Sequence, residues 1–138
     1  MNRPIKFRAW DKKTKTWIDN DRYNWYVSPS GLLVWNVVED SWTERSQDNG
    51  ERFELSQFTG LTDKNGKEIY SSDQLRVKSN RTKKIVIGIV KWIDGEAAFR
   101  LVVEGDYMYR LDDIHLPEIV GNEFEGLLKS GEGDIMEV

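Results

Sequence analysis

Few residues in this 138-residue chain have the types and spacing that chemistry requires. There is no cysteine, which excludes thiol nucleophiles, disulfides and cysteine-based zinc sites. The one histidine, His115, is flanked by Asp112, Asp113 and Glu118, and such a set binds a metal only where the side chains converge. A single histidine among loop carboxylates is more often a solvated surface group, so we expect no metal site.

Other catalytic patterns are missing from the sequence as well. It has no GxSxG nucleophile elbow, no GxGxxG loop and no Walker-type lysine loop. The turn at Asp63–Gly66 is unlike a calcium loop, because its glycine comes fourth and no glutamate occupies position 12. Adjacent acids such as Asp112 and Asp113 do acid–base work only where their environment separates their pKa values. We expect no catalytic residue, no cofactor, no small-molecule substrate and no enzymatic activity.

A basic segment offers the sharpest candidate for a binding site. The chain has a formal net charge of −4, yet residues 76–91 carry six Lys and Arg residues and no acid. Small β-barrels hold single-stranded nucleic acid with basic groups along its backbone and aromatic rings stacked on its bases. The predicted contacts are Arg76, Lys78, Arg81, Lys83, Lys84, Lys91 and Trp92. The acidic total favours the alternative of a solvated basic loop beside core aromatics.

Aromatic content and charge distribution favour a second hypothesis, a protein-interaction module. Six Trp and five Tyr exceed what a small core must hold, and both are favoured interface anchors. Residues 1–20 carry six basic side chains against two acids, whereas residues 94–138 carry three against twelve. Such segments could pair between subunits. We prefer a homo-oligomer or a protein partner, and nucleic acid stays the alternative.

Apolar and polar residues alternate in short runs between turn signals, which is typical of an all-β sandwich or small barrel. Asn65-Gly66 predicts a type I′ hairpin turn. Gly88 lies inside the most β-prone run and predicts a bulge or a sharp bend. Residues 112–117 are expected to be irregular. The expected strands cover residues 5–10, 16–18, 23–27, 32–38, 53–57, 75–77, 85–92, 97–103, 107–111 and 118–121.

A division of the chain is expected near Phe58-Thr59-Gly60. It separates an N-terminal β region (1–57) from a barrel half (58–125), and an acidic flexible tail (126–138) follows; we expect these parts to form one compact unit. Asn122 as N-cap, with Phe124, Leu127 and Leu128 at helical spacing, predicts one short C-terminal helix. The N-terminus lacks a signal-peptide apolar region, and the longest apolar run, 31–38, is too short to span a bilayer. We therefore expect a cytoplasmic protein without membrane contact.

Four segments, taken in order over residues 5–124, resemble the YopX-like family of phage and prophage proteins. They are IKFRAWD at 5–11, FTGLTDKNGKEIY at 58–70, VKW at 90–92 with AAF at 97–99, and IVGN at 119–122. The chain departs from the family pattern at 71–75, where the family has Glu-Gly-Asp and an aliphatic strand, and at 123–126, where it has an aromatic residue and Asn-Pro-Glu. The resemblance implies a mainly β fold with a small SH3-like barrel, an origin in a phage or prophage, and no established activity. It supplies no catalytic residues.

Overall fold

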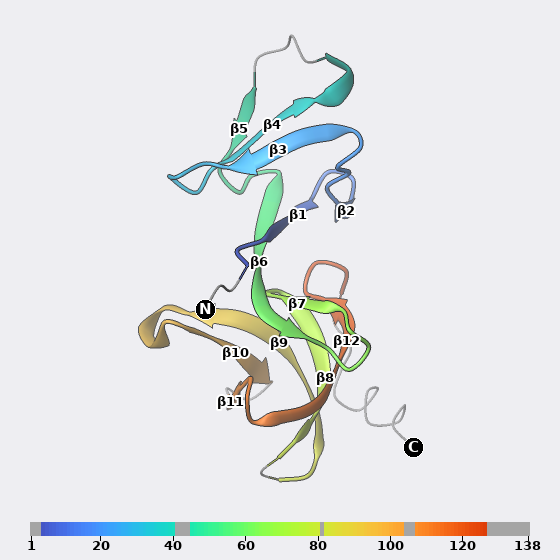
Figure 1. Cartoon of the computed structure of the whole chain (residues 1–138), viewed down its shortest axis with the longest axis vertical. Helices are drawn as coiled ribbons and strands as arrows, with labels where there is room; N and C mark the ends of the chain where they lie inside the picture. The colour runs from blue at the N-terminus through green and yellow to red at the C-terminus, as the bar shows by residue number, and fades with distance from the viewer. Residues whose placement is uncertain (1–3, 41–44, 81, 104–106, 127–138) are drawn as a thin grey trace. The chain divides into compact units, whose positions relative to one another are not determined.

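The structure is a computed structural model that describes residues 4–40, 45–80, 82–103 and 107–126. It is mostly β, which confirms the predicted fold class (Figure 1). The chain divides into two compact units: an N-terminal unit, Phe7–Ser56, and a C-terminal unit made of Met1–Lys6 and Gln57–Val138. The division lies inside one strand, β6 (Phe53–Thr62). No helix in the described ranges is long and apolar enough to cross a membrane.

The N-terminal unit contains two hairpins. The first is β1 (Phe7–Asp11) with β2 (Thr16–Trp17), as the sequence predicts, and the strand order β2-β1-β6-β7 includes it. The second is β3 (Tyr23–Val27) with β4 (Leu33–Val37), extended by β5 (Ser46–Asp48). A 3₁₀ turn, η1 (Val38–Asp40), follows β4. The buried core of the N-terminal unit is Ala9, Ile18, Tyr23, Leu33 and Phe53.

The C-terminal unit is built on a five-stranded antiparallel sheet of order β11-β10-β9-β8-β12, which curves into a half-barrel (Figure 1). Its strands are β8 (Asp73–Ser79), β9 (Ile85–Ile93), β10 (Ala98–Val103), β11 (Tyr107–Arg110) and β12 (Ile114–Asn122), and η2 (Asp94–Glu96) joins β9 to β10. The β-branched run predicted as the strongest strand is β9, at the centre. The buried core is Ile69, Leu75, Val77, Val90, Phe99 and Leu101. The SH3-like type of barrel stays a prediction.

Gly88 does not form a bulge. The pairing of β9 with β8 is continuous on both sides of Gly88, and the pairing with β10 is regular up to Gly88, so a bulge is excluded; the alternative, a sharp bend, stays a prediction. A Cβ atom at Gly88 would lie 2.7 Å from the carbonyl oxygen of Val102 and 2.9 Å from Cγ of Leu101. The glycine is there because the neighbouring strand approaches too closely for a side chain.

The β6–β7 hairpin forms as predicted, with β7 at Glu68–Tyr70, but its turn is not of type I′. Gly66 has φ of +83°, while Asn65 is not among the residues with positive φ, and type I′ needs both. The Gly66 N–H donates to the Asp63 carbonyl (3.0 Å), and the Asp63 N–H donates to the Lys67 carbonyl (2.7 Å). The result is a longer loop in which only the glycine is left-handed.

The last strand, β12, begins earlier than expected. Ile114 and His115, predicted to be irregular, pair with β8 instead, whereas Leu116 and Pro117 lie in a register shift; a second shift follows Ile119. The Asn122 Oδ1 accepts hydrogen bonds from the N–H groups of Phe124 and Glu125, as an N-cap does. The described chain forms a turn there and ends at residue 126. The rest of the predicted helix and the predicted tail lie outside the described residues.

Candidate functional site

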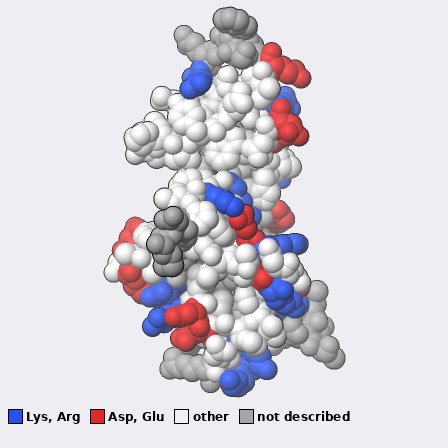
Figure 2. All heavy atoms as spheres, viewed as in Figure 1, with Lys and Arg blue, Asp and Glu red and all other residues white. Residues whose placement is uncertain are grey.

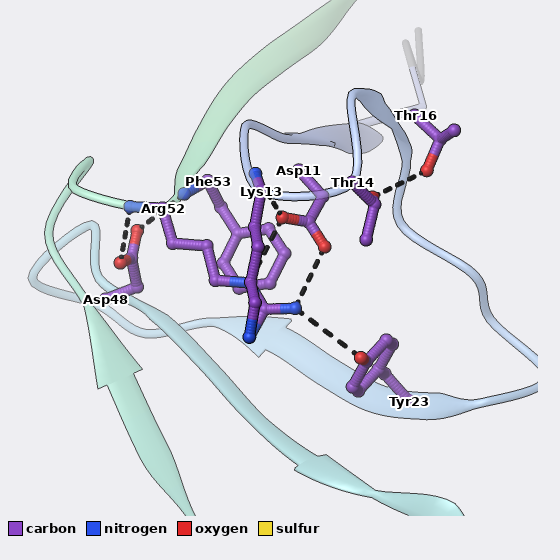
Figure 3. A network of polar contacts seen from close by, with 8 residues as sticks. All are labelled: Asp11, Lys13, Thr14, Thr16, Tyr23, Asp48, Arg52 and Phe53. Atoms are coloured by element: carbon purple, nitrogen blue, oxygen red, sulfur yellow. Dashed lines mark hydrogen bonds and ion pairs between the residues drawn. The ribbon is translucent and has the colours of Figure 1, made fainter.

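A buried ion pair between Asp11 and Arg52 organises the N-terminal unit (Figure 3). The guanidinium donates from Nε to Oδ1 (3.1 Å) and from Nη2 to Oδ2 (3.0 Å), and the Asp11 side chain is only 3% exposed. The rings of Tyr23, Trp35 and Phe53 surround the guanidinium at 5.8, 5.0 and 4.9 Å. Both charged groups therefore have their main partners within the unit.

The electrostatics of this ion pair are those of a structural contact. Burial would raise the pKa of Asp11, but hydrogen bonds from Arg52 and the Lys13 N–H, with the charge of Arg52, outweigh it and lower the pKa below its usual 3.8. Asp48 accepts three further backbone hydrogen bonds beside it, from Gly50, Arg52 and Phe53. A carboxylate held ionised in this way is suited to positioning β1 against Arg52, and is unsuited to proton donation.

Of the predicted basic contacts, Arg76 is committed to the fold. It lies on β8 directly opposite Glu118 of β12, and its Nη2 forms an ion pair with the Glu118 Oε1. The Arg76 side chain is 10% exposed and that of Glu118 is 24% exposed. Lys64 approaches the same carboxylate oxygen at 3.7 Å. Glu118 is thus shared between two cations, and Arg76 has little surface to offer to a ligand.

Lys78 lies on the same face of β8 as Arg76 and is exposed. It lines a hollow of about 360 Å³ together with Lys64, Arg76, Ile85 and Leu116. Lys83 and Lys84 lie in the turn between β8 and β9, where the Lys83 N–H donates to the Ser79 carbonyl (2.9 Å), and both are exposed. Arg81 lies outside the described residues.

Lys91 and Trp92 do not join this basic group. The basic turn precedes β9, whereas Lys91 and Trp92 lie near its far end, about 25 Å away at the rise of a strand. As neighbours in a strand they point to opposite faces. Trp92 packs edge-to-face on Phe99 at 5.0 Å and is 47% exposed, and Lys91 lies opposite Arg100. The predicted cations and the aromatic ring therefore do not line one groove, and nucleic-acid contact by them stays a prediction.

The single histidine does not gather its flanking acids. His115 is exposed and lies opposite Lys78, while Glu118 faces Arg76 and Asp112 pairs with Arg110. Within the described ranges, no group of three or more His, Cys, Asp or Glu residues is placed to hold a metal ion. On the face that Figure 2 shows, basic and acidic side chains of the C-terminal unit are intermixed.

Two features were not found by sequence reasoning. One is the outer edge of β11, where the five-stranded sheet ends and the Met108 side chain is 49% exposed. The other is a hollow of about 330 Å³ in the N-terminal unit, lined by residues of β3 and β4 and by Arg45. A signal for the second is the alternation of Asn24 and Tyr26 with Tyr23 and Trp25, a pattern that indicates a strand and does not by itself indicate a binding site.

Comparison with known proteins places the chain in a family. The model of the YopX protein family matches residues 6–126. The structure is similar to that of the protein yopX from Bacillus subtilis, with a TM-score of 0.60 and 17% sequence identity over 93% of this chain and 100% of that one. It is also similar to protein EF1440 from Enterococcus faecalis, with a TM-score of 0.52 and 22% identity over 90% and 96% of the two chains. At such identities the two structures show the shared fold alone. No curated protein matches the chain.

The family match extends from the residue before β1 to the turn after β12. It confirms the resemblance carried by the segments at 5–11, 58–70, 90–99 and 119–122. The departure at 71–75 covers the turn before β8 and the first three residues of β8, and the departure at 123–126 lies in the turn after β12. With most of its length matched, the chain belongs to the YopX family.

Proposed function

We propose that this protein is a cytoplasmic phage or prophage accessory module that works by binding other proteins, its own copies first, and not by catalysis. One observation carries the proposal. Among the described residues, the five-stranded sheet of the C-terminal unit ends at β11, and this edge strand presents a half-exposed Met108. An unprotected sheet edge is a template for pairing with another chain.

The two edges of this sheet differ in their protection. At the β12 edge, Pro117 removes a donor, the pairing shifts register twice, and the Lys64 N–H donates to the Pro117 carbonyl (2.8 Å). At the β11 edge, the pairing with β10 is regular and the strand contains neither proline nor lysine. Its one cation, Arg110, is neutralised by Asp112 through two hydrogen bonds of 3.0 and 2.8 Å. Antiparallel pairing of two β11 strands about a two-fold axis would extend the sheet across a dimer.

The absence of catalysis is part of the proposal and is supported by the carboxylates. General acids need a pKa raised toward neutrality. Two buried carboxylates, Asp11 and Asp63, have lowered pKa values instead. For Asp63, burial would raise the pKa, but hydrogen bonds from the N–H groups of Lys67, Ile119 and Asn65 outweigh it. Both groups serve as acceptors that hold the backbone.

Light scattering coupled to size-exclusion chromatography tests self-association over a wide range of protein concentration. We expect a dimer that Met108→Lys converts to a monomer, because a lysine on the edge opposes strand pairing. Leu61→Lys is the matched control, since Leu61 is 44% exposed on another strand and should leave the dimer intact. A wild-type protein that stays monomeric at high concentration contradicts self-association. Affinity purification from infected or lysogenic cells then tests for a different protein partner.

Nucleic-acid binding is the second candidate, and the exposure of Lys83 and Lys84 in one turn is the observation that favours it. If the turn contacts a phosphate backbone, reversing both charges should lower affinity. It should also reduce the magnitude of the slope of log K against log salt concentration by roughly 1.5 to 2. A wild-type protein that binds no oligonucleotide in low salt rules this candidate out.

A further inference from the structure

The N-terminal unit carries a second candidate site, on the sheet face that turns away from its core. Along β3 and β4, Tyr23, Trp25 and Trp35 contribute to the core, so the alternate residues point to the opposite face. These residues are Asn24 and Tyr26 on β3, and Val34 and Asn36 on β4. With Arg45, just before β5, and with parts of Trp25 and Trp35, they line the hollow of about 330 Å³.

Two amide side chains lie side by side in this hollow. Asn24 and Asn36 are directly opposite each other in the β3–β4 pairing, and Asn24 is exposed. Neither side-chain amide forms a hydrogen bond with another residue of the described part of the chain. Each amide offers two donors and one acceptor oxygen, so together they match the polar edge of a planar ligand.

A ring and a cation complete the hollow. Tyr26 is 48% exposed, and the guanidinium carbon of Arg45 lies 5.6 Å from the centre of its ring. The Arg45 Nη1 also donates to the Tyr26 hydroxyl at 3.5 Å, a long contact. No described carboxylate is paired with Arg45, and none lines the hollow. The cation is therefore available to an anionic group beside the ring.

The lining favours a nucleotide over a peptide. A peptide strand needs pockets for aliphatic side chains, but the one aliphatic residue here, Val34, is only 5% exposed. An aromatic face, amide groups and an arginine are the groups that bind unstacked bases and their phosphates. The volume is at the lower end of the range for small-ligand sites, which suits a single nucleotide.

We infer that this hollow binds a nucleobase with its phosphate, supplied by a free nucleotide or by one position of a single strand. Tyr26 stacks on the base, Asn24 and Asn36 hydrogen-bond its edge, and Arg45 pairs with the phosphate. Adenine is the best match for an asparagine amide, because its N6 amino group and N7 offer a donor beside an acceptor. The inference does not rest on self-association through β11.

The test measures binding of the full chain to two probes in low salt, a fluorescein-labelled oligodeoxyadenylate and AMP. The wild type should bind at least one probe, and the probe that binds distinguishes a strand from a free nucleotide. Tyr26→Ala should weaken that binding by roughly five-fold to a hundred-fold, the usual loss for a stacking ring, and Tyr26→Phe should retain it. Arg45→Gln should weaken it and reduce its salt dependence.

Trp92→Ala is the matched control, because Trp92 is 47% exposed against 48% for Tyr26 and lies in the other unit. It should leave the affinity unchanged. Circular dichroism of each variant establishes that the fold is kept. Three results would overturn the inference: no binding of either probe by the wild type, equal binding by Tyr26→Ala and wild type, or a loss caused by Trp92→Ala instead. If the Tyr26 and Arg45 variants still bind the strand, and only reversal of the charges of Lys83 and Lys84 abolishes that binding, the strand-binding site is the basic turn.

Discussion

Individual charged residues in this protein act mainly as structural partners of the backbone and of one another. The contrast is clearest between two arginine–aspartate pairs of similar geometry. Arg52 and Asp11 meet with side chains that are 23% and 3% exposed, whereas Arg110 and Asp112 meet at 64% and 65%. Water screens the second pair much more than the first, so the same chemistry has different consequences for stability.

Asp11→Asn should lower the free energy of unfolding by about 3 kcal/mol, because it leaves a mostly buried arginine without its countercharge. Arg110→Gln, the control, should change it by less than about 0.5 kcal/mol. Urea unfolding of the three proteins at neutral pH measures both differences. Equal effects of the two substitutions would contradict the distinction between a buried and an exposed pair.

The same pair predicts a pH dependence. Asp11 has a lowered pKa in the folded protein, so its contribution to stability is complete above the ordinary pKa of 3.8 and is lost as pH falls through the lower, folded-state value. The stability difference between wild type and Asp11→Asn should therefore be constant near neutrality and shrink below about pH 4. If this stability difference already shrinks near neutral pH, the pH dependence belongs to another titrating group.

At the scale of elements, strand positions followed from the sequence and their contacts did not. Alternation and turn residues located β1, β3, β4, β9 and β10. The sequence pattern could not show that Arg76 lies opposite Glu118, because the two are 42 residues apart and meet only through the β8–β12 pairing. It likewise missed the first part of β12, since Leu116 has a left-handed φ of +50° and Pro117 follows it, and both are typical of loops.

The hollow of the N-terminal unit was missed for a related reason. Asn24 and Asn36 become neighbours only through the β3–β4 register, and Arg45 reaches Tyr26 from outside the hairpin. A pattern along one strand shows which residues share a face. It does not show what a second strand places beside them, and binding sites depend on that placement.

Gly88 offers a test of element packing. Gly88→Ala should lower the free energy of unfolding by about 2–3 kcal/mol, because the added Cβ would meet the backbone of β10 at 2.7 Å. Gly95→Ala is the control, since nothing lies within 4 Å of the position of its added Cβ. Thermal or urea unfolding gives both values. A neutral Gly88→Ala would mean that β10 moves away at little cost.

At the scale of the whole molecule, the two units have separate hydrophobic cores with no member in common among the described residues. Leu33 is 1% exposed in the N-terminal core, and Leu101 is fully buried in the C-terminal core. Leu33→Ala and Leu101→Ala remove about the same buried volume, and each should lower the free energy of unfolding of its own unit by about 2–5 kcal/mol. The open question is how far that loss spreads along the chain.

We expect each loss to stay largely in its own unit, because cooperative unfolding follows contiguous packed cores. Amide hydrogen exchange measures this residue by residue. Leu33→Ala should speed exchange in β3 and β4 and leave β9 and β10 protected, and Leu101→Ala should do the reverse. Should both variants speed exchange equally in all four strands, the chain would unfold as one cooperative unit. In that case the shared strand β6, which begins in one unit and ends in the other, would be the element that couples them.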